Sequence, residues 1–233
     1  MHIKAQMTKT QEIIDYFNEI GKHVFTLSDV SKLTLKRRNY LSRLLSTNSK
    51  IKKIERNKYY LNGANINEVA SNIVEPSYVS FMAAFRFYDL TTQIPAKVSV
   101  VAIKRHEAIF FENMRIEFKT VNRKRFFGYR KIGNAMIALP EKAILDSLYL
   151  REPSFTDVEE ALSKGLEEKT IDVRKLMNYA KEMKSAVLIN RLGFILEDLG
   201  VDASRLNKHK SRVKVLLFGR GTKENRRWNV KYD

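Results

Sequence analysis

The chain has 233 residues, of which 44% are hydrophobic and 30% charged, and it contains no cysteine. This composition is typical of a folded protein with one large domain or two modest ones, and it excludes disulfides and thiolate metal sites. The apolar runs are too short to cross a bilayer and the first residues lack the apolar core of a signal peptide, so the sequence predicts a cytoplasmic protein without membrane contact.

The formal net charge is +17, and it is unevenly distributed along the chain. Residues 1–63 contain 13 Lys and Arg against 5 Asp and Glu, and residues 204–233 contain 10 against 2, which is a net charge of +8 in each segment. Residues 64–203 contain 20 against 19. A bias shared by a whole proteome would not leave the middle neutral. The clustered charge therefore predicts a polyanionic partner, with nucleic acid as the first choice.

Helical spacing predicts three helices in the first part of the chain. The first runs from Thr10 to Gly21, and the second is a short helix for which Ser28 is the expected N-cap. The third helix is capped by Thr34 and is amphipathic. Its apolar arc consists of Tyr40, Leu41, Leu44 and Leu45. Its opposite arc consists of Lys36, Asn39, Arg43 and Ser46.

A basic hairpin follows these helices. Two β-prone segments, Ile51–Ile54 and Lys58–Leu61, flank a turn in which Asn57 tolerates the positive φ of a tight hairpin. Tyr59 and Leu61 should point together into the core. Helix, short helix, helix and hairpin in this order predict a winged helix-turn-helix over residues 1–63.

The cations of this unit suit a DNA duplex. Lys36, Asn39 and Arg43 suit base edges, with Arg bidentate to guanine and Asn to adenine, whereas Arg37 and Arg38 are better placed for phosphates. The wing supplies further contacts to the flanking groove or phosphates through Lys52, Lys53, Arg56 and Lys58. The alternatives are a solvated basic face on an ordinary helical domain and a protein–protein module.

The remainder predicts a larger mixed domain, so the fold class is α+β. Residues 64–75 are expected to be a connector with some helical character, and a helix should start at Pro76 or Ser77. Residues 76–233 are expected to form a mixed sheet (97–139), a helical part (140–200) and basic C-terminal strands (212–233). Strands are expected at 97–103, 115–121, 126–132 and 135–139, helices at 140–150, 156–168, 171–184 and 186–199, and two strands around Gly219–Gly221.

Two further basic segments form a predicted secondary basic surface. In RKRFFGYRK (123–131), aromatic residues alternate with Arg123, Lys124, Arg125, Arg130 and Lys131. This pattern fits single-stranded nucleic acid, and an RNA-binding protein is one alternative, but it also fits a strand with an apolar inner side. The C-terminal segment adds Arg226 and Arg227, whose partner could be DNA, RNA or protein.

Signals of catalysis are weak, and we expect neither an enzyme nor a cofactor or metal. No Gly-rich phosphate loop occurs and the histidines are scattered. Glu117 and Lys119 share one face of an expected strand, as in a metal-dependent nuclease with Asp89 or Glu107 as partner acid, although a salt bridge explains them equally well. Asp146, in the middle of an apolar helix, is expected to be a buried hydrogen-bonding anchor.

Two segments, residues 78–102 and 133–150, resemble the core of the AbiEi-type antitoxins. The family pairs a helix ending in Leu-Thr-x-Gln-Ile-Pro with a strand, and a second strand with a Pro-Glu-Lys/Arg helix that carries an Asp. The matching residues are Leu90, Thr91, Gln93, Ile94, Pro95, Pro140, Glu141, Lys142 and Asp146. The closing RRWNVKYD is similar to the family's last strand.

The resemblance implies a transcriptional repressor of a type IV toxin–antitoxin module. Such proteins bind inverted repeats in their own promoter through the winged helix, and the partner gene encodes a nucleotidyltransferase-like toxin that is countered without a stable complex. The implied DNA contacts are Lys36, Arg37, Arg38, Asn39, Arg43, Arg56 and Lys58. Asn57 stands where relatives often have Gly.

Overall fold

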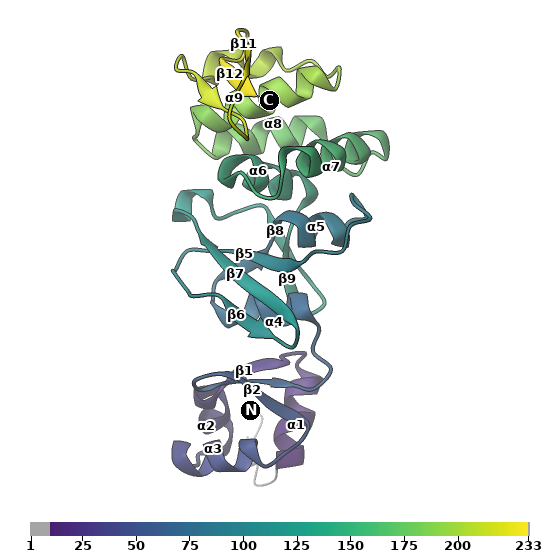
Figure 1. Ribbon diagram of the computed structural model, residues 1–233. Coiled ribbons are helices and arrows are strands. Elements are labelled where there is room, and N and C mark those ends of the chain that lie inside the picture. Colours follow the sequence, from purple (N-terminus) through teal and green to yellow (C-terminus); the bar gives the residue numbers. More distant parts are fainter. Residues whose placement is uncertain (1–9, 233) are drawn as a thin grey trace, which may run out of the picture.

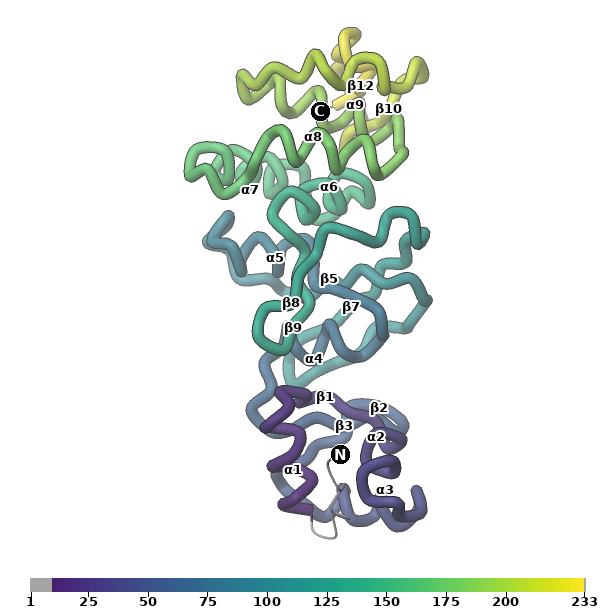
Figure 2. Tube along the Cα trace, turned by 180° about the vertical axis from the view of Figure 1, so that it is seen from behind, coloured from purple at the N-terminus to yellow at the C-terminus, as the bar shows by residue number. Residues whose placement is uncertain are grey.

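The computed structural model describes residues 10–232, so residues 1–9 and 233, at the ends of the two expected domains, lie outside the described residues. The protein is a mixed α+β structure with three sheets in its described part. The sheets follow one another along the long axis of the molecule, with the N-terminal unit (residues 10–63) at one end and the C-terminal strands at the other (Figures 1 and 2). No helix between residues 10 and 232 is both long and apolar enough to cross a membrane.

The N-terminal unit contains three helices and one antiparallel sheet with the strand order β1-β3-β2. Its helices are α1 (Thr10–Glu19), α2 (Leu27–Thr34) and α3 (Arg38–Ser46). Its strands are β1 (Val24–Thr26), β2 (Ile51–Glu55) and β3 (Lys58–Leu61). The helix ending near Gly21 and the hairpin are confirmed, and Asn57 has the expected positive φ of 61°. β1 was not predicted.

The caps of α2 and α3 differ from the prediction. Thr26, and not Ser28, caps α2, because its hydroxyl accepts from the backbone N–H of Asp29 and the Asp29 carboxylate accepts from that of Thr26. Thr34 does not cap α3 either. Its hydroxyl donates to the Val30 carbonyl at 2.9 Å inside the last turn of α2, and α3 starts only at Arg38, with Arg37 as its N-cap.

The N-terminal sheet separates two apolar cores. Tyr59 and Leu61 pack against α1, α2 and α3, as predicted, together with Phe25 of β1. Tyr60 faces the opposite side, where its ring lies 5.0 Å from that of Phe111. The second core also includes α4 (Ile66–Ile73). The segment expected to be a connector is therefore a helix packed between the N-terminal unit and the middle sheet.

The middle sheet has six strands in the order β6-β7-β5-β4-β9-β8. They are β4 (Ser77–Val79), β5 (Lys97–Ala102), β6 (Ile109–Phe111), β7 (Met114–Thr120), β8 (Tyr129–Ile132) and β9 (Ala135–Ala138). The strands expected at 97–103, 115–121 and 135–139 are confirmed. The one expected at 126–132 is shorter: it follows the 3-10 turn η1 (Arg123–Arg125) and begins only at Tyr129, after Gly128, whose φ is 71°.

The prediction of a helix from Pro76 or Ser77 was wrong. Residues 77–79 form β4 between β5 and β9, and only then does α5 (Phe81–Phe87) begin. All three residues of β4 are buried, including the polar Ser77, and the apolar residues of α5 follow almost directly. Periodicity cannot distinguish so short a buried strand from the first turn of a helix.

A helical layer and a small sheet complete the fold. The helices α6 (Pro140–Leu150), α7 (Phe155–Glu167), α8 (Val173–Glu182) and α9 (Ala186–Asp198) lie close to their predicted bounds. After the 3-10 segment η2 (Ser204–His209), three short strands replace the two expected: β10 (Val215–Leu216), β11 (Lys223–Asn225) and β12 (Val230–Tyr232). Trp228 packs directly on α9, where a Cβ on Gly193 would come within 2.3 Å of its ring.

Candidate nucleic-acid interface

Helix α3 lies at the end of the molecule that is distant from the middle sheet (Figures 1 and 2). Leu41 and Leu45 are fully buried against the rest of the N-terminal unit, whereas Asn39 and Arg43 are exposed, as predicted. The prediction was wrong for Tyr40, which is 51% exposed, and Leu44 is only half-buried. A helix of nine residues packs through one narrow stripe with i, i+4 spacing, and Tyr40 lies outside that stripe.

The turn before α3 carries further cations. Arg37 is the N-cap of α3 without a side-chain cap, and Arg38 is its first residue; both are exposed. Lys36 is half-buried, and its carbonyl accepts from the Ser31 hydroxyl at 3.1 Å. No ion pair between described residues involves these cations or Arg43, and α3 has no acidic residue in its first turn. The positive charge at this N-terminus opposes the helix dipole and is not compensated within residues 10–232.

Sequence reasoning did not single out Leu35, which lies in the same turn and is 78% exposed. The sequence does contain a signal for it: Leu35 does not fit the spacing of the buried leucines of α3, and it stands directly before a run of cations.

The two lysines of β2 lie on opposite faces of the N-terminal sheet. Lys53 is paired with Tyr59, so it shares the face that packs on α3, where the Tyr59 hydroxyl is 3.4 Å from that of Ser42. Lys52 is paired with Tyr60, on the face turned toward the middle sheet. Both lysines are exposed. The apolar residues of this strand do not alternate strictly because both faces of the sheet are covered: Ile51 packs in the core of the N-terminal helices and Ile54 against the core of the middle sheet.

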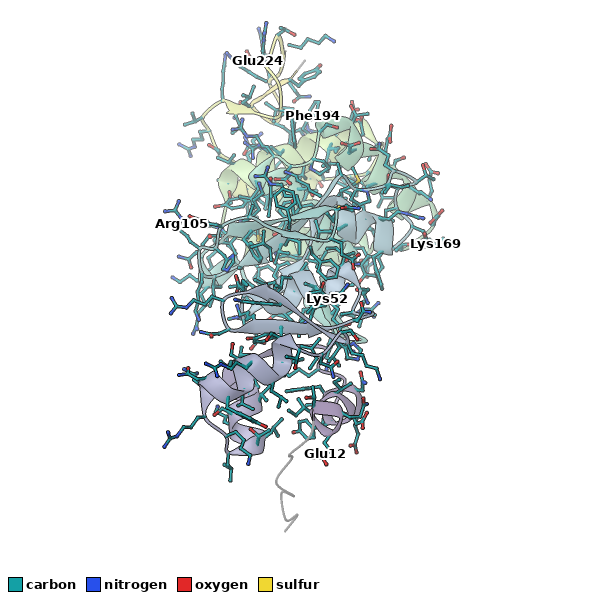
Figure 3. All side chains as sticks on the ribbon, turned by 60° about the horizontal axis from the view of Figure 1, so that its bottom comes forward. Glu12, Lys52, Arg105, Lys169, Phe194 and Glu224 are labelled. Atoms are coloured by element: carbon teal, nitrogen blue, oxygen red, sulfur yellow. The ribbon has the colours of Figure 1, made fainter. Side chains whose placement is uncertain are left out.

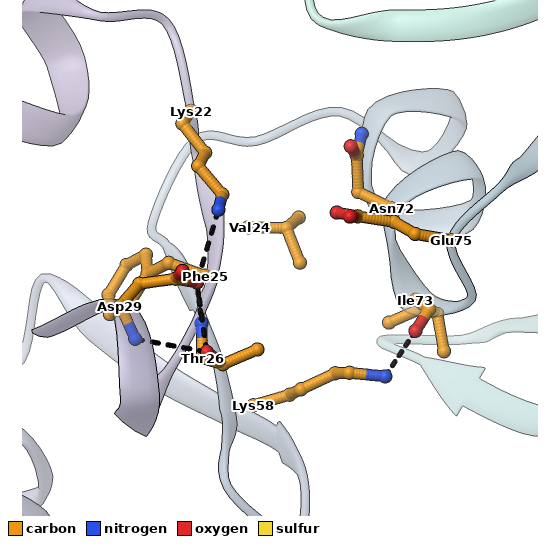
Figure 4. Close-up of a pocket in the computed structure, with 9 residues that line it drawn as sticks. All are labelled: Lys22, Val24, Phe25, Thr26, Asp29, Lys58, Asn72, Ile73 and Glu75. Atoms are coloured by element: carbon orange, nitrogen blue, oxygen red, sulfur yellow. Dashed lines mark hydrogen bonds and ion pairs between the residues drawn. The ribbon is translucent and has the colours of Figure 1, made fainter. Parts of the chain in front are cut away.

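Lys58 is directed away from α3. Its ammonium group lies 2.7 Å from the Glu55 carboxylate and donates to the Ile73 carbonyl at the end of α4, beside a cavity of about 200 Å³ (Figure 4). The other Glu55 oxygen is 3.1 Å from Nε2 of His106 in the loop after β5. Lys58 therefore joins the β2–β3 hairpin to the middle of the molecule, while Arg56 at the hairpin turn remains exposed.

The aromatic residues of segment 123–131 are half-buried and pack against the core. Phe126 and Tyr129 pack on Tyr78, with ring centroids 5.1 and 4.8 Å apart, and Phe127 packs on Tyr179. Base stacking would compete with these ring contacts. Among the cations, Arg125 donates to the Met183 carbonyl at 2.9 Å after the end of α8, and Arg130 lies 5.8 Å from the Tyr88 ring. The exposed cations of the segment are Arg123, Lys124, Arg130 and Lys131.

The C-terminal cations are distant from α3. The last strands lie at the opposite end of the molecule from the N-terminal unit (Figures 1 and 2), as the positions of Glu224 and Glu12 also show (Figure 3). Arg226 is exposed, and Arg227 pairs with Glu197 of α9 at 2.8 Å. The two basic ends of the sequence therefore form two separate surfaces.

A fully buried charge cluster joins α6 to the middle sheet. Asp146 accepts from the hydroxyls of Tyr78 at 3.1 Å and Ser80 at 2.9 Å and pairs with Lys142, so the predicted anchor role is confirmed. Burial, and next the charge of Asp146, raise the pKa of Tyr78 well above 10, which keeps its hydroxyl protonated as a donor. The cluster is closed to solvent and holds α6 on β4.

Glu117 and Lys119 do share a face, with 3.3 Å between their charged atoms. The second carboxylate beside them is Glu152, not Asp89 or Glu107 as expected, because Lys97 and Lys119 each bridge Glu117 and Glu152 at 2.6–3.3 Å. Hydrogen bonding from Lys97 lowers the pKa of Glu117. Residues 10–232 contain no group of three or more His, Cys, Asp or Glu that could hold a metal ion. These carboxylates are occupied by lysines.

No protein-family model matches the chain, and no curated protein matches it in sequence. The likeness to the AbiEi-type antitoxins at residues 78–102 and 133–150 therefore stays a prediction.

Proposed function

We propose that the N-terminal unit is a winged helix-turn-helix that binds double-stranded DNA in a sequence-specific manner. α2 and α3 are the helix-turn-helix, and the β2–β3 hairpin is the wing. The order of the elements supports this assignment, as does the N-terminal excess of positive charge. The main observation in support is the contrast between the two faces of α3. Leu41 and Leu45 are fully buried, while Asn39 and Arg43 are exposed at the end of the molecule that is distant from the middle sheet.

The exposure of each cation divides the contacts. Asn39 and Arg43, on the outer face of α3, read base edges in the major groove. Arg37 and Arg38, at the start of the helix, bind phosphates. Lys53 and Arg56 are the wing contacts, because Lys53 lies on the α3 face of the sheet and Arg56 is at the exposed turn. Lys36, Lys52 and Lys58 contribute less, since Lys36 is half-buried and the other two lie on the opposite face.

The regulatory role in this proposal rests on the resemblance at residues 78–102 and 133–150. On that basis the protein is an autoregulating repressor, the antitoxin of a type IV pair, and its operator consists of inverted repeats in its own promoter. The functional partner is a nucleotidyltransferase-like toxin. The remainder of the chain, from α4 onward, is then the larger antitoxin domain, and the protein acts in the cytoplasm.

Footprinting of the DNA upstream of the gene tests the proposal. The protein should protect an inverted repeat, and Arg43→Ala should lose this protection at concentrations where Arg174→Ala retains it. Arg174 is an exposed residue of α8, so Arg174→Ala is a control that removes the same charge at a site outside α3. Equal protection by both variants, or binding without site preference, contradicts the proposal. Metal-dependent cleavage that is lost in Glu117→Ala would point to the nuclease alternative, and preference for single-stranded RNA to the RNA-binding one.

A further inference from the structure

Leu35 connects α2 to α3 in an unusual conformation. Its φ and ψ are 56° and 18°, in the left-handed region, and its N–H donates to the Ser31 carbonyl at 2.9 Å to close α2. Glycine or asparagine is the usual residue at such a helix end, because a bulky side chain is unfavourable there. The side chain is also 78% exposed, so it contributes little to the core.

Comparable positions of the chain carry polar side chains. Arg151, Lys169 and Lys184 also have positive φ just after helices, and all three are exposed and charged. Phe81 has positive φ but is buried. Among the non-glycine residues with positive φ between 10 and 232, Leu35 alone is apolar and exposed. Backbone strain and apolar exposure together are characteristic of a functional contact, since the fold itself would be better served by glycine.

The surroundings of Leu35 favour DNA over a protein surface. It is followed by Lys36, Arg37 and Arg38, none of which has an ion-pair partner among the described residues. An apolar protein partner would have to bury these charges, which is costly without paired acids. The major groove instead offers phosphates to the cations and, at each A·T pair, the C5-methyl group of thymine as an apolar surface.

We propose that Leu35 packs against the C5-methyl group of a thymine when α3 enters the major groove. This inference rests on the proposed function and extends it: the α2–α3 turn reads a T·A or A·T pair beside the bases that Asn39 and Arg43 contact. The left-handed backbone then aims the side chain at the groove instead of at the core.

Deoxyuridine, which differs from thymidine by this methyl group, provides the test. The duplex protected in the footprint is prepared with each thymine in turn replaced by uracil, and Kd is measured by fluorescence anisotropy at fixed salt. At one position per half-site the wild-type protein should bind about fourfold more weakly, which corresponds to one buried methyl group. Leu35→Gly and Leu35→Asn should bind the thymine duplex roughly tenfold more weakly, as expected for a lost leucine contact. Both should be insensitive to uracil at that position.

Two controls separate this effect from folding and from general loss of apolar surface. Both variants should melt at or above the wild-type temperature, because glycine and asparagine accept the left-handed conformation. Ile94→Gly removes another aliphatic side chain, 85% exposed in the loop before β5, and should keep wild-type affinity and uracil sensitivity.

The outcomes distinguish the two proposals. If Arg43→Ala weakens site binding but Leu35→Gly retains wild-type affinity and uracil sensitivity, the Leu35 contact is wrong and the DNA-binding proposal stands. If Leu35→Gly lowers the molecular mass in sedimentation without altering uracil sensitivity, Leu35 belongs to a contact between two copies, and the inference is overturned. If the wild-type protein has no duplex site preference, the proposed function itself fails.

Discussion

Tyr59 and Tyr60 are consecutive residues of β3, and their side chains are buried in two different cores. Tyr59 packs against α3, while the ring of Tyr60 lies 5.0 Å from that of Phe111 in the middle sheet. The N-terminal sheet is therefore covered on both faces, by the helices on one side and by α4 and β6 on the other. This apolar contact, together with the ion pair of Glu55 with His106, joins the N-terminal unit to the middle of the molecule.

The same alternation divides the wing lysines and leads to a first prediction. Lys53→Ala should weaken binding to every duplex to a similar extent and should reduce the slope of log K against log salt concentration by about 0.9, since one phosphate contact is lost. Lys58→Ala should leave affinity and slope near the wild-type values. Instead it should lower the free energy of unfolding by about 1 kcal/mol, because the Ile73 carbonyl loses its donor. Salt titrations and urea denaturation of both variants check this. If Lys58→Ala instead reduced affinity and salt slope while Lys53→Ala did not, the hairpin would contact DNA through the other face of the sheet.

Arg43 is expected to contribute to discrimination rather than to general affinity. Arg43→Ala should cost about 1–3 kcal/mol on the protected site and much less on unrelated DNA, because a bidentate contact to guanine is lost only where the guanine is present. Competition binding with the site and with a scrambled duplex measures this difference. Arg174, an exposed residue of α8, provides the matched charge control, and Arg174→Ala should alter neither value.

Local patterns in the sequence were sufficient to predict part of the candidate DNA-binding surface. The spacing of Leu41 and Leu45 predicted the buried stripe of α3 and with it the exposure of Asn39 and Arg43. Asn57 predicted the hairpin because the turn requires positive φ. The start of α3 could not be predicted from Thr34, since a side chain that can cap the next helix can equally bond to a carbonyl of the preceding turn.

Other features depend on contacts between distant segments. The sequence groups Lys58 with the other hairpin lysines as a DNA contact, but the carbonyl it binds belongs to α4, fifteen residues away. Glu152 was not considered as the partner acid of Glu117, although Lys97 and Lys119 bridge the two. Sequence periodicity cannot reveal contacts of this kind. The bridge between Glu117 and Glu152 forms only when β5, β7 and the end of α6 pack together.

The buried pair of Lys142 and Asp146 should be important for stability and not for DNA binding. Asp146→Ala would leave the Lys142 ammonium group buried without a countercharge, and we expect a loss of about 3–5 kcal/mol in urea denaturation. The double variant Lys142→Met/Asp146→Leu should lose considerably less, because it buries no unpaired charge. Below its melting temperature each variant should bind duplex DNA as the wild type does. A double variant as unstable as Asp146→Ala would show that the hydrogen bonds of Tyr78 and Ser80, rather than the charge pairing, stabilise this region.

The pair of Glu117 and Glu152 should make stability depend on pH in the acid range. Hydrogen bonding from Lys97 lowers the pKa of Glu117; for Glu152, burial alone would raise the pKa, but hydrogen bonds from Lys119, Ser99 and Lys97 outweigh it and lower the pKa. Carboxyls whose pKa is lower in the folded state than the ordinary 4.5 stabilise the fold above that value. This contribution is lost as the pH falls through the folded-state pKa values.

The variant Glu117→Gln/Glu152→Gln should therefore be less stable than the wild type at pH 7, and the difference should shrink progressively below the ordinary pKa of 4.5. Urea denaturation at a series of pH values measures both curves. Glu159→Gln is a control of opposite sign, because burial and next the charge of Asp198 raise the pKa of Glu159. Removing that charge should stabilise the protein at pH 7, and the gain should disappear in acid. Parallel curves for the double variant and the wild type would show that the lysines of β5 and β7 do not favour the ionised carboxylates in the folded protein.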